Sequence, residues 1–191
     1  NADPAAQQQP GQRLARRQRG GGREFRARGQ QRLRRTLVLG GIGAEVARIA
    51  KGMGLNVIAW NRTPRPDAGV PMVDIDTLLQ SSDIVSLNLV LNDETRGFLD
   101  KARIARMKPG MILVNTARGA LVDEAAMIEA LKSGHIRHAG LDVFHNEPLK
   151  ADHPLARLDN VTLAAHAAFR TLEASMTLLR RAIDIVKRVQ P

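Results

Sequence analysis

Three polar segments, each directly after an apolar run, contain the side chains best suited to chemistry. Arg118 follows the run MILVN, Glu147 follows AGLDV, and His166 follows the short run VTL. An arginine can hold a carboxylate and polarise a carbonyl, and a histidine beside a carboxylate can transfer a proton near neutral pH. Each of these residues alone is more often structural or solvated. Together they fit hydride transfer to a carbonyl.

A second candidate site is the glycine-rich turn VLGGIGA at residues 38–44. In the dinucleotide-binding pattern G-x-G-x-x-G, Gly40 and Gly43 occupy the second and third glycine positions. These positions let the backbone approach a pyrophosphate and let the helix pack close to the strand. The helix that starts near Ile42 would offer free N–H groups to phosphates. Val38 occupies the first glycine position, so this match alone is weak.

The end of the next predicted strand bears on which dinucleotide the turn would bind. Asn61 lies 21 residues after Gly40, where a NAD site has an acidic residue for the ribose 2′-hydroxyl. Arg62 and Thr63 follow it, and a guanidinium and a hydroxyl suit a 2′-phosphate. The sequence therefore favours NADP over NAD. The alternative is that Arg62 is an ordinary surface residue.

Alternating apolar patterns predict the elements that would position these residues. Strands are expected at 36–39, 56–60, 83–89, 111–115, 139–143 and 161–163, and helices at 42–53, 75–79, 101–107, 123–132 and 171–189. Strands that alternate with helices indicate a Rossmann-type α/β fold, a doubly wound parallel sheet with helices on both faces. Sites in such sheets lie beyond the carboxyl ends of the strands, where the polar segments are found.

Composition excludes several other classes of protein. The chain contains no Cys, which excludes disulfides, thiol catalysis and cysteine-bound zinc, and fits the reducing cytoplasm where we expect the protein. Only 3% of the residues are aromatic, too few for a surface that stacks single-stranded nucleic acid. No apolar run approaches the ~20 residues that cross a bilayer. We therefore expect no membrane segment, and no metal site.

The positive charge is concentrated at the start of the chain. Residues 1–35 contain ten Arg and two acidic residues, or +8 of the net charge of +10. This segment has little apolar surface to bury, so we predict a disordered tail at 1–35, an NAD(P)-binding domain at 36–168 and a C-terminal helix at 169–191. An Arg-rich tail could bind nucleic acid or serve as a transit peptide, but we favour a solvated tail without a nucleic-acid partner.

Five segments together resemble the cofactor-binding domain of the D-isomer-specific 2-hydroxyacid dehydrogenases, the family of D-glycerate, glyoxylate/hydroxypyruvate and phosphoglycerate dehydrogenases. They cover most of residues 38–171 and read GGIGAEVA, SSDIVSLNLVLNDETRG, MKPGMILVNTARGALVDEAAMIEAL, HAGLDVFHNEPL and AHAAFRT. The resemblance implies NAD(P)-dependent reduction of a small 2-oxo acid such as glyoxylate or hydroxypyruvate. It implies Arg118 as the substrate-binding cation and His166 as the acid/base, with Glu147 as its partner.

The resemblance also implies where the cofactor would be contacted. Asp142 would bind the nicotinamide amide. The implied contacts are at Gly41, Ile42, Asn61, Thr116, Ala117, Arg118, Asp142 and His166. Family members usually form dimers through the cofactor domain, so we expect a homodimer.

Departures from the family pattern support a second interpretation. Residues unusual for the family are Val38, Asn88, Val90 and Ala165. The first strand is expected to be short, because Arg34 and Arg35 stand where apolar residues are usual. We also expect the N-terminal part of the family's substrate domain to be absent, with the Arg-rich tail in its place. The alternative is therefore a truncated NAD(P)-binding remnant without turnover.

Overall fold

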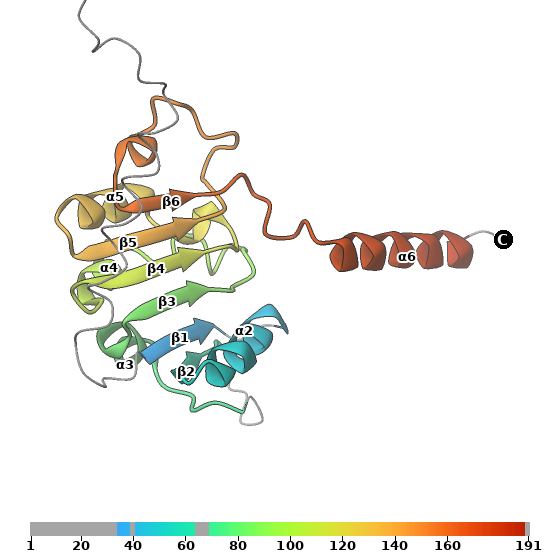
Figure 1. Cartoon of the computed structure of the whole chain (residues 1–191), viewed down its shortest axis with the longest axis horizontal. Helices are drawn as coiled ribbons and strands as arrows, with labels where there is room; N and C mark the ends of the chain where they lie inside the picture. Colours follow the sequence, from blue (N-terminus) through green and yellow to red (C-terminus); the bar gives the residue numbers. More distant parts are fainter. Residues whose placement is uncertain (1–33, 39–40, 64–68, 190–191) are drawn as a thin grey trace, which may run out of the picture. The chain divides into compact units, whose positions relative to one another are not determined.

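Six parallel strands form one sheet in the order β2-β1-β3-β4-β5-β6 (Figure 1). The structure is a computed structural model that describes residues 34–38, 41–63 and 69–189. The strands are β1 Arg34–Val38, β2 Asn56–Trp60, β3 Ile84–Leu87, β4 Met111–Asn115, β5 Ile136–Leu141 and β6 Val161–Leu163. The parallel sheet with its intervening helices confirms the predicted Rossmann-type α/β class. The predicted tail up to residue 33, and Gly40, lie outside the described residues.

Helices connect the strands, and aspartates begin three of them. The helices are α2 Gly41–Gly52, α3 Ile75–Ser81, α4 Lys101–Arg106, α5 Glu124–Lys132 and α6 Leu172–Val189. Asp74, Asp100 and Asp123 each accept a hydrogen bond from the backbone N–H three residues later. Such caps satisfy donors that the first helical turn leaves without a partner, and so they define where α3, α4 and α5 start.

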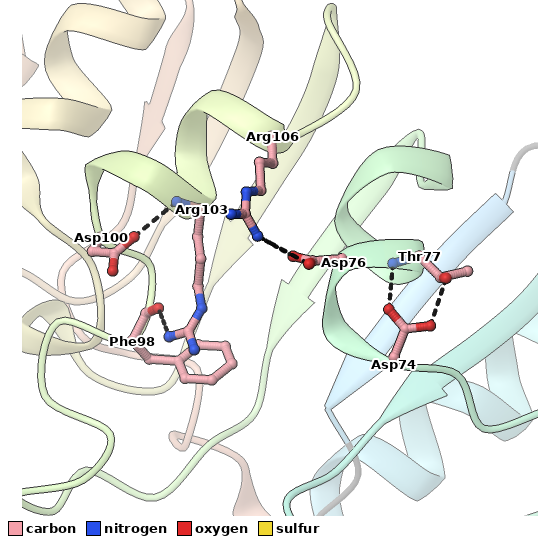
Figure 2. A network of polar contacts seen from close by, with 7 residues as sticks. All are labelled: Asp74, Asp76, Thr77, Phe98, Asp100, Arg103 and Arg106. Atoms are coloured by element: carbon pink, nitrogen blue, oxygen red, sulfur yellow. Dashed lines mark hydrogen bonds and ion pairs between the residues drawn. The ribbon is translucent and has the colours of Figure 1, made fainter.

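An ion pair joins two neighbouring helices at the surface. In Figure 2 the guanidinium of Arg106 at the end of α4 reaches Asp76 in the first turn of α3, with its Nη1 2.9 Å from both carboxylate oxygens. Arg103 turns the other way, and its Nη1 donates to the carbonyl of Phe98 at 2.6 Å. Exposed pairs of this kind contribute ~1 kcal/mol or less. The polar contacts therefore orient α3 and α4, while the apolar core stabilises them.

Two clusters of buried apolar side chains hold the sheet and helices together. The larger cluster contains Leu113 of the central strand β4, which is fully buried, and residues of β3, β5 and helices α3 to α5. The smaller one joins Ala47 and Ala50 of α2 to Val57 and Ala59 of β2. Burial of each large side chain contributes about 1.5–3 kcal/mol. The apolar core thus makes a rigid platform for the carboxyl ends of the strands.

Several predicted boundaries are wrong. The strand predicted at 139–143 is Ile136–Leu141, because Ile136 is buried and Arg137 points to solvent as in any half-buried strand. The strand predicted at 83–89 is shorter, at Ile84–Leu87. The expectation of a short first strand is also wrong, since Arg34 and Arg35 pair through their backbones with Asn56 and Val57 of β2. The hydrogen bonds between strands join main-chain groups, so charged side chains are tolerated near the start of a strand.

The C-terminal helix α6 forms as predicted, but no described side chain along it is buried. Its apolar residues recur at helical spacing and include Leu172, Met176, Leu179, Ile183 and Val186. Among the described residues, no helix combines the length and the apolar character that crossing a membrane requires.

Candidate active site

Three neighbouring strands end at the same edge of the sheet, and the predicted reactive residues follow them. Asn115, the last residue of β4, stands opposite Leu141 of β5, which in turn stands opposite Leu163 of β6. Arg118, Glu147 and His166 come three to six residues after these strand ends. The parallel register therefore places the three loops side by side at one edge of the sheet.

His166 and Glu147 form a direct pair. The Nδ1 atom of His166 lies 2.6 Å from Oε2 of Glu147, and the backbone N–H of Phe144 donates to Oε1 at 3.0 Å. These two hydrogen bonds, the one from His166 foremost, hold the pKa of the Glu147 carboxyl below its ordinary value. An ionised Glu147 orients the imidazole through Nδ1, which leaves Nε2 for proton transfer with a ligand. Both side chains are about a third exposed, at 37% and 36%.

Arg118 lies within electrostatic reach of this pair. Its positive charge is the last of the causes that lower the pKa of Glu147. The loop that contains Arg118 is held by Asn115. The Asn115 side chain donates to the carbonyl of Arg118 at 2.9 Å and accepts from the N–H of Ala117 at 3.0 Å. The structure thus pairs His166 with Glu147 and places Arg118 where its charge acts on Glu147, and it adds Asn115, whose contacts the sequence analysis missed.

A cavity of about 520 Å³ adjoins the histidine pair. Glu147 and His166 line one part of it, and apolar residues line the rest, among them Phe144, Leu149 and Leu163. A few polar groups that converge within an apolar wall are typical of a small-molecule site. The cavity is large enough for a small ligand.

Asp142 is almost fully buried, at 5% exposure. Its two carboxylate oxygens accept hydrogen bonds from the backbone N–H groups of Ala167 and Ala168, each at 2.9 Å. The implied contact of Asp142 with a nicotinamide amide stays a prediction, as do the contacts of the exposed Thr116 and the half-buried Ala117.

A second cavity, of about 280 Å³, lies at the end of β2. Asn61, Arg62 and Thr63 line it, together with residues of the loop that follows β3. Arg62 forms an ion pair with Glu94 of that loop, although both side chains are more than half exposed. Glu94 was missed by the sequence analysis, because nothing in a linear pattern indicates that it faces Arg62.

The glycine turn leads into α2 at the point where the sheet order reverses, between β1 and its two neighbours. Gly41, Ile42 and Gly43 form the first helical turn, which contains no acidic residue, and Ile42 is 72% exposed. Ligands of doubly wound sheets bind at this switch point, and phosphates bind free N–H groups at helix starts. The described part of the turn is suited to a pyrophosphate.

At Gly119 the loop that contains Arg118 packs closely against the loop that contains Glu147. A Cβ atom at residue 119 would collide with the main chain of Phe144 and would lie 2.6 Å from the backbone nitrogen of His145. The short 3-10 helix Gly119–Leu121 therefore packs directly against the segment that leads to Glu147.

In the ranges 34–38, 41–63 and 69–189, no three His, Asp or Glu side chains are grouped as metal ligands.

Comparisons with known proteins show which family the chain resembles in sequence and fold. Residues 8–168 match the family model described as D-isomer specific 2-hydroxyacid dehydrogenase, NAD binding domain. A glyoxylate reductase from Korarchaeum cryptofilum is 47% identical over 134 residues, which are 68% of this chain and 40% of that protein. A hydroxypyruvate reductase from Thermotoga maritima is 40% identical over 168 residues, 85% of this chain and 54% of that protein.

A solved structure shares both fold and sequence. The D-isomer specific 2-hydroxyacid dehydrogenase from Xanthobacter autotrophicus Py2 in complex with NADPH and MES has a TM-score of 0.73 and 37% identity, covering 83% of this chain and 68% of that one. The chain spans about half the length of the curated relatives it matches. The family match starts within the segment 1–35, so the domain boundary at residue 36 stays a prediction.

The contact of Gly119 with Phe144 generates a prediction about stability. Gly119→Ala should lower the free energy of unfolding by about 1–3 kcal/mol, because the added methyl group forces two main-chain segments apart. The matched control is Gly140→Ala in β5, where the nearest atom to an added Cβ is Val114 Cγ2 at 4.0 Å. Urea unfolding followed by circular dichroism measures both variants. Equal stabilities for the two would contradict the close packing of these loops.

Proposed function

Because the chain belongs to the D-isomer-specific 2-hydroxyacid dehydrogenase family, we propose that it binds NAD(P) along the carboxyl edge of its sheet and reduces a small 2-oxo acid of the glyoxylate or hydroxypyruvate type. The single observation that supports this most is the His166–Glu147 pair, 2.6 Å apart, with the charge of Arg118 acting on it. A cation, an acid/base and an orienting carboxylate are the groups that such a reduction requires.

Each of the three residues has a distinct task in this proposal. Arg118 binds the substrate carboxylate and polarises the carbonyl oxygen. A reduced nicotinamide held at this edge would supply the hydride for the carbonyl carbon. His166 gives the proton on its Nε2 to the developing alkoxide, so that the product is the 2-hydroxy acid. Glu147 stabilises the imidazolium before transfer and keeps Nε2 directed toward the substrate.

We further propose that NADP is preferred over NAD. Arg62 and Thr63 line the cavity at the end of β2, where a 2′-phosphate would lie, and the neighbouring Asn61 side chain donates to the Thr63 carbonyl at 3.0 Å. A guanidinium is the strongest partner for a phosphate among protein side chains. Glu94 opposes this preference, because its carboxylate pairs with Arg62 and would repel a 2′-phosphate.

A second candidate is a cofactor-binding remnant without turnover. One observation favours it: the acid/base pair is about a third exposed. Water in an open site weakens the electrostatic interactions on which transition-state stabilisation depends. Both candidates share the same cofactor site and differ in catalysis.

Turnover separates these two candidates. We expect the chain to oxidise NADPH in the presence of glyoxylate or hydroxypyruvate, followed as the loss of absorbance at 340 nm, and we expect His166→Ala to lower kcat at least about 100-fold. The control is His138→Ala, since His138 bonds Thr162 at 2.9 Å on neighbouring strands. NADPH binding without turnover would select the remnant, and a lack of binding would contradict both candidates.

The cofactor preference generates a second prediction. Arg62→Ala should weaken NADPH binding about tenfold or more, a loss of ~1.4 kcal/mol, and should leave NADH binding nearly unchanged. Glu94→Gln should act in the opposite direction and strengthen NADPH, because it removes the competing charge. Isothermal titration calorimetry with NADPH and with NADH measures the ratio of the two dissociation constants for each variant. An equal loss of both cofactors in Arg62→Ala would contradict a 2′-phosphate site.

We also propose a homodimer that buries the apolar face of α6. Leu179 on this face is 56% exposed, and exposed apolar stripes of this kind mark association surfaces. Leu179→Asp should weaken self-association about tenfold or more, whereas Thr177→Asp, an equal charge change on the opposite face, should not. Sedimentation equilibrium measures both. A monomeric chain at all accessible concentrations would contradict the homodimer.

A further inference from the structure

Two buried polar side chains stand next to each other where β4 and β5 end. Asn115 is 2% exposed and Asp142 is 5% exposed. The backbone N–H of Asp142 donates to the carbonyl of Asn115 at 3.0 Å, which extends the strand ladder by one bond. A buried polar side chain is costly unless its hydrogen bonds are satisfied. Each of the two must therefore have partners that compensate for its burial.

The partners of both side chains lie in the loops of the proposed site. Asn115 bonds the carbonyl of Arg118 and the N–H of Ala117, at 2.9 and 3.0 Å. Asp142 reaches across to the loop after β6 and accepts from the N–H groups of Ala167 and Ala168. Hydrogen bonds thus join the end of β4 to the loop that contains Arg118, and the end of β5 to the loop that contains His166.

The backbone at His166 explains why the loop after β6 needs such a tie. His166 has a φ of 51°, in the left-handed region that residues with side chains avoid. This conformation is unfavourable for a residue other than glycine, because Cβ comes close to a carbonyl oxygen. Two hydrogen bonds from the next two N–H groups to a buried carboxyl group can offset that cost. The strained turn in turn directs the imidazole toward Glu147.

We propose that Asp142 is a positioning residue for His166, whose carboxylate holds the left-handed turn and so keeps Nδ1 of the imidazole on Glu147. Asn115 has the corresponding role for Arg118. The consequence for catalysis rests on the proposed function, but the geometry does not, because it concerns contacts within the chain alone. Asp142 thus has a task that is separate from the nicotinamide contact that the family resemblance implies.

Kinetics alone cannot separate these two tasks of Asp142, since loss of either would lower the rate. The protein without cofactor can separate them, because there is then no nicotinamide to contact. The titration of Glu147 is the suitable readout. Its pKa is held low chiefly by the hydrogen bond from His166, so movement of the imidazole away from Glu147 raises that pKa toward its ordinary value.

The experiment is a carboxyl-¹³C NMR titration of the cofactor-free full chain and its variants. His166→Ala sets the upper limit, because Glu147 then loses the largest cause that lowers its pKa and keeps the bond from Phe144. Asp142→Asn, which keeps the shape but presents an amide N–H₂ to a backbone donor, should move the Glu147 pKa at least halfway to that limit. Asp74 is the internal control, because its pKa is lowered by Thr77 and should be the same in every variant.

A Glu147 pKa that stays at the wild-type value in a folded Asp142→Asn variant would overturn the proposal. If the variant does not fold, amide hydrogen exchange of the wild-type chain decides. The N–H groups of Ala167 and Ala168 should then exchange at least about tenfold more slowly than unbonded amides, and exchange at the unprotected rate would refute the tie. If the NMR or exchange result contradicts the positioning role but the chain turns over substrate, only the positioning role is overturned. If the NMR or exchange result supports the positioning role but the chain shows no turnover, only the catalytic proposal is overturned.

Discussion

The ladder between β4 and β5 is the constraint on which the rest of the site depends. It sets Asn115 opposite Leu141 and places Asp142 one step beyond the last strand residue. In a strand, a slip of one residue turns every side chain to the other face. Such a slip would move Leu113 to the half-buried face of β4, point Asn115 away from the Arg118 loop and leave the His166 turn without its carboxyl group. The apolar core and the polar site are therefore set by the same register.

The electrostatic design of the site is uneven from one end of the sheet edge to the other. At β4 to β6 the charges are organised by buried groups, and the ionised Glu147 faces an imidazole. At β2 the pair between Arg62 and Glu94 is exposed, so solvent and salt screen it. The first region has a fixed arrangement that would suit the proposed proton transfer, whereas the exposed pair of the second would be exchanged for the proposed ligand phosphate at little cost.

Much of the fold was predictable from sequence, because strongly periodic segments report their own structure. The strands at 56–60, 111–115 and 161–163 have the predicted bounds, and so does the C-terminal end of α5. The predicted ends of β5 were wrong, since the polar residues Arg137 and His138 interrupt the apolar run of a strand whose alternate residues are buried. The positions of Arg118, Glu147 and His166 after strand ends were also predictable, because all three follow apolar runs, and their roles stay a prediction. Glu94, Asn115 and Gly119 were not, because their importance comes from partners distant in sequence.

In the proposed function a dinucleotide binds across this single edge, with its nicotinamide end at β4 to β6. The most direct measurement is a ¹⁵N–¹H NMR titration of the chain with NADPH. We expect the largest shifts at amides of both ends of the edge: Gly43, Arg62, Arg118, Ala167 and Ala168. Shifts confined to α6 or to the groove between α4 and α5, or no shifts at all, would contradict it.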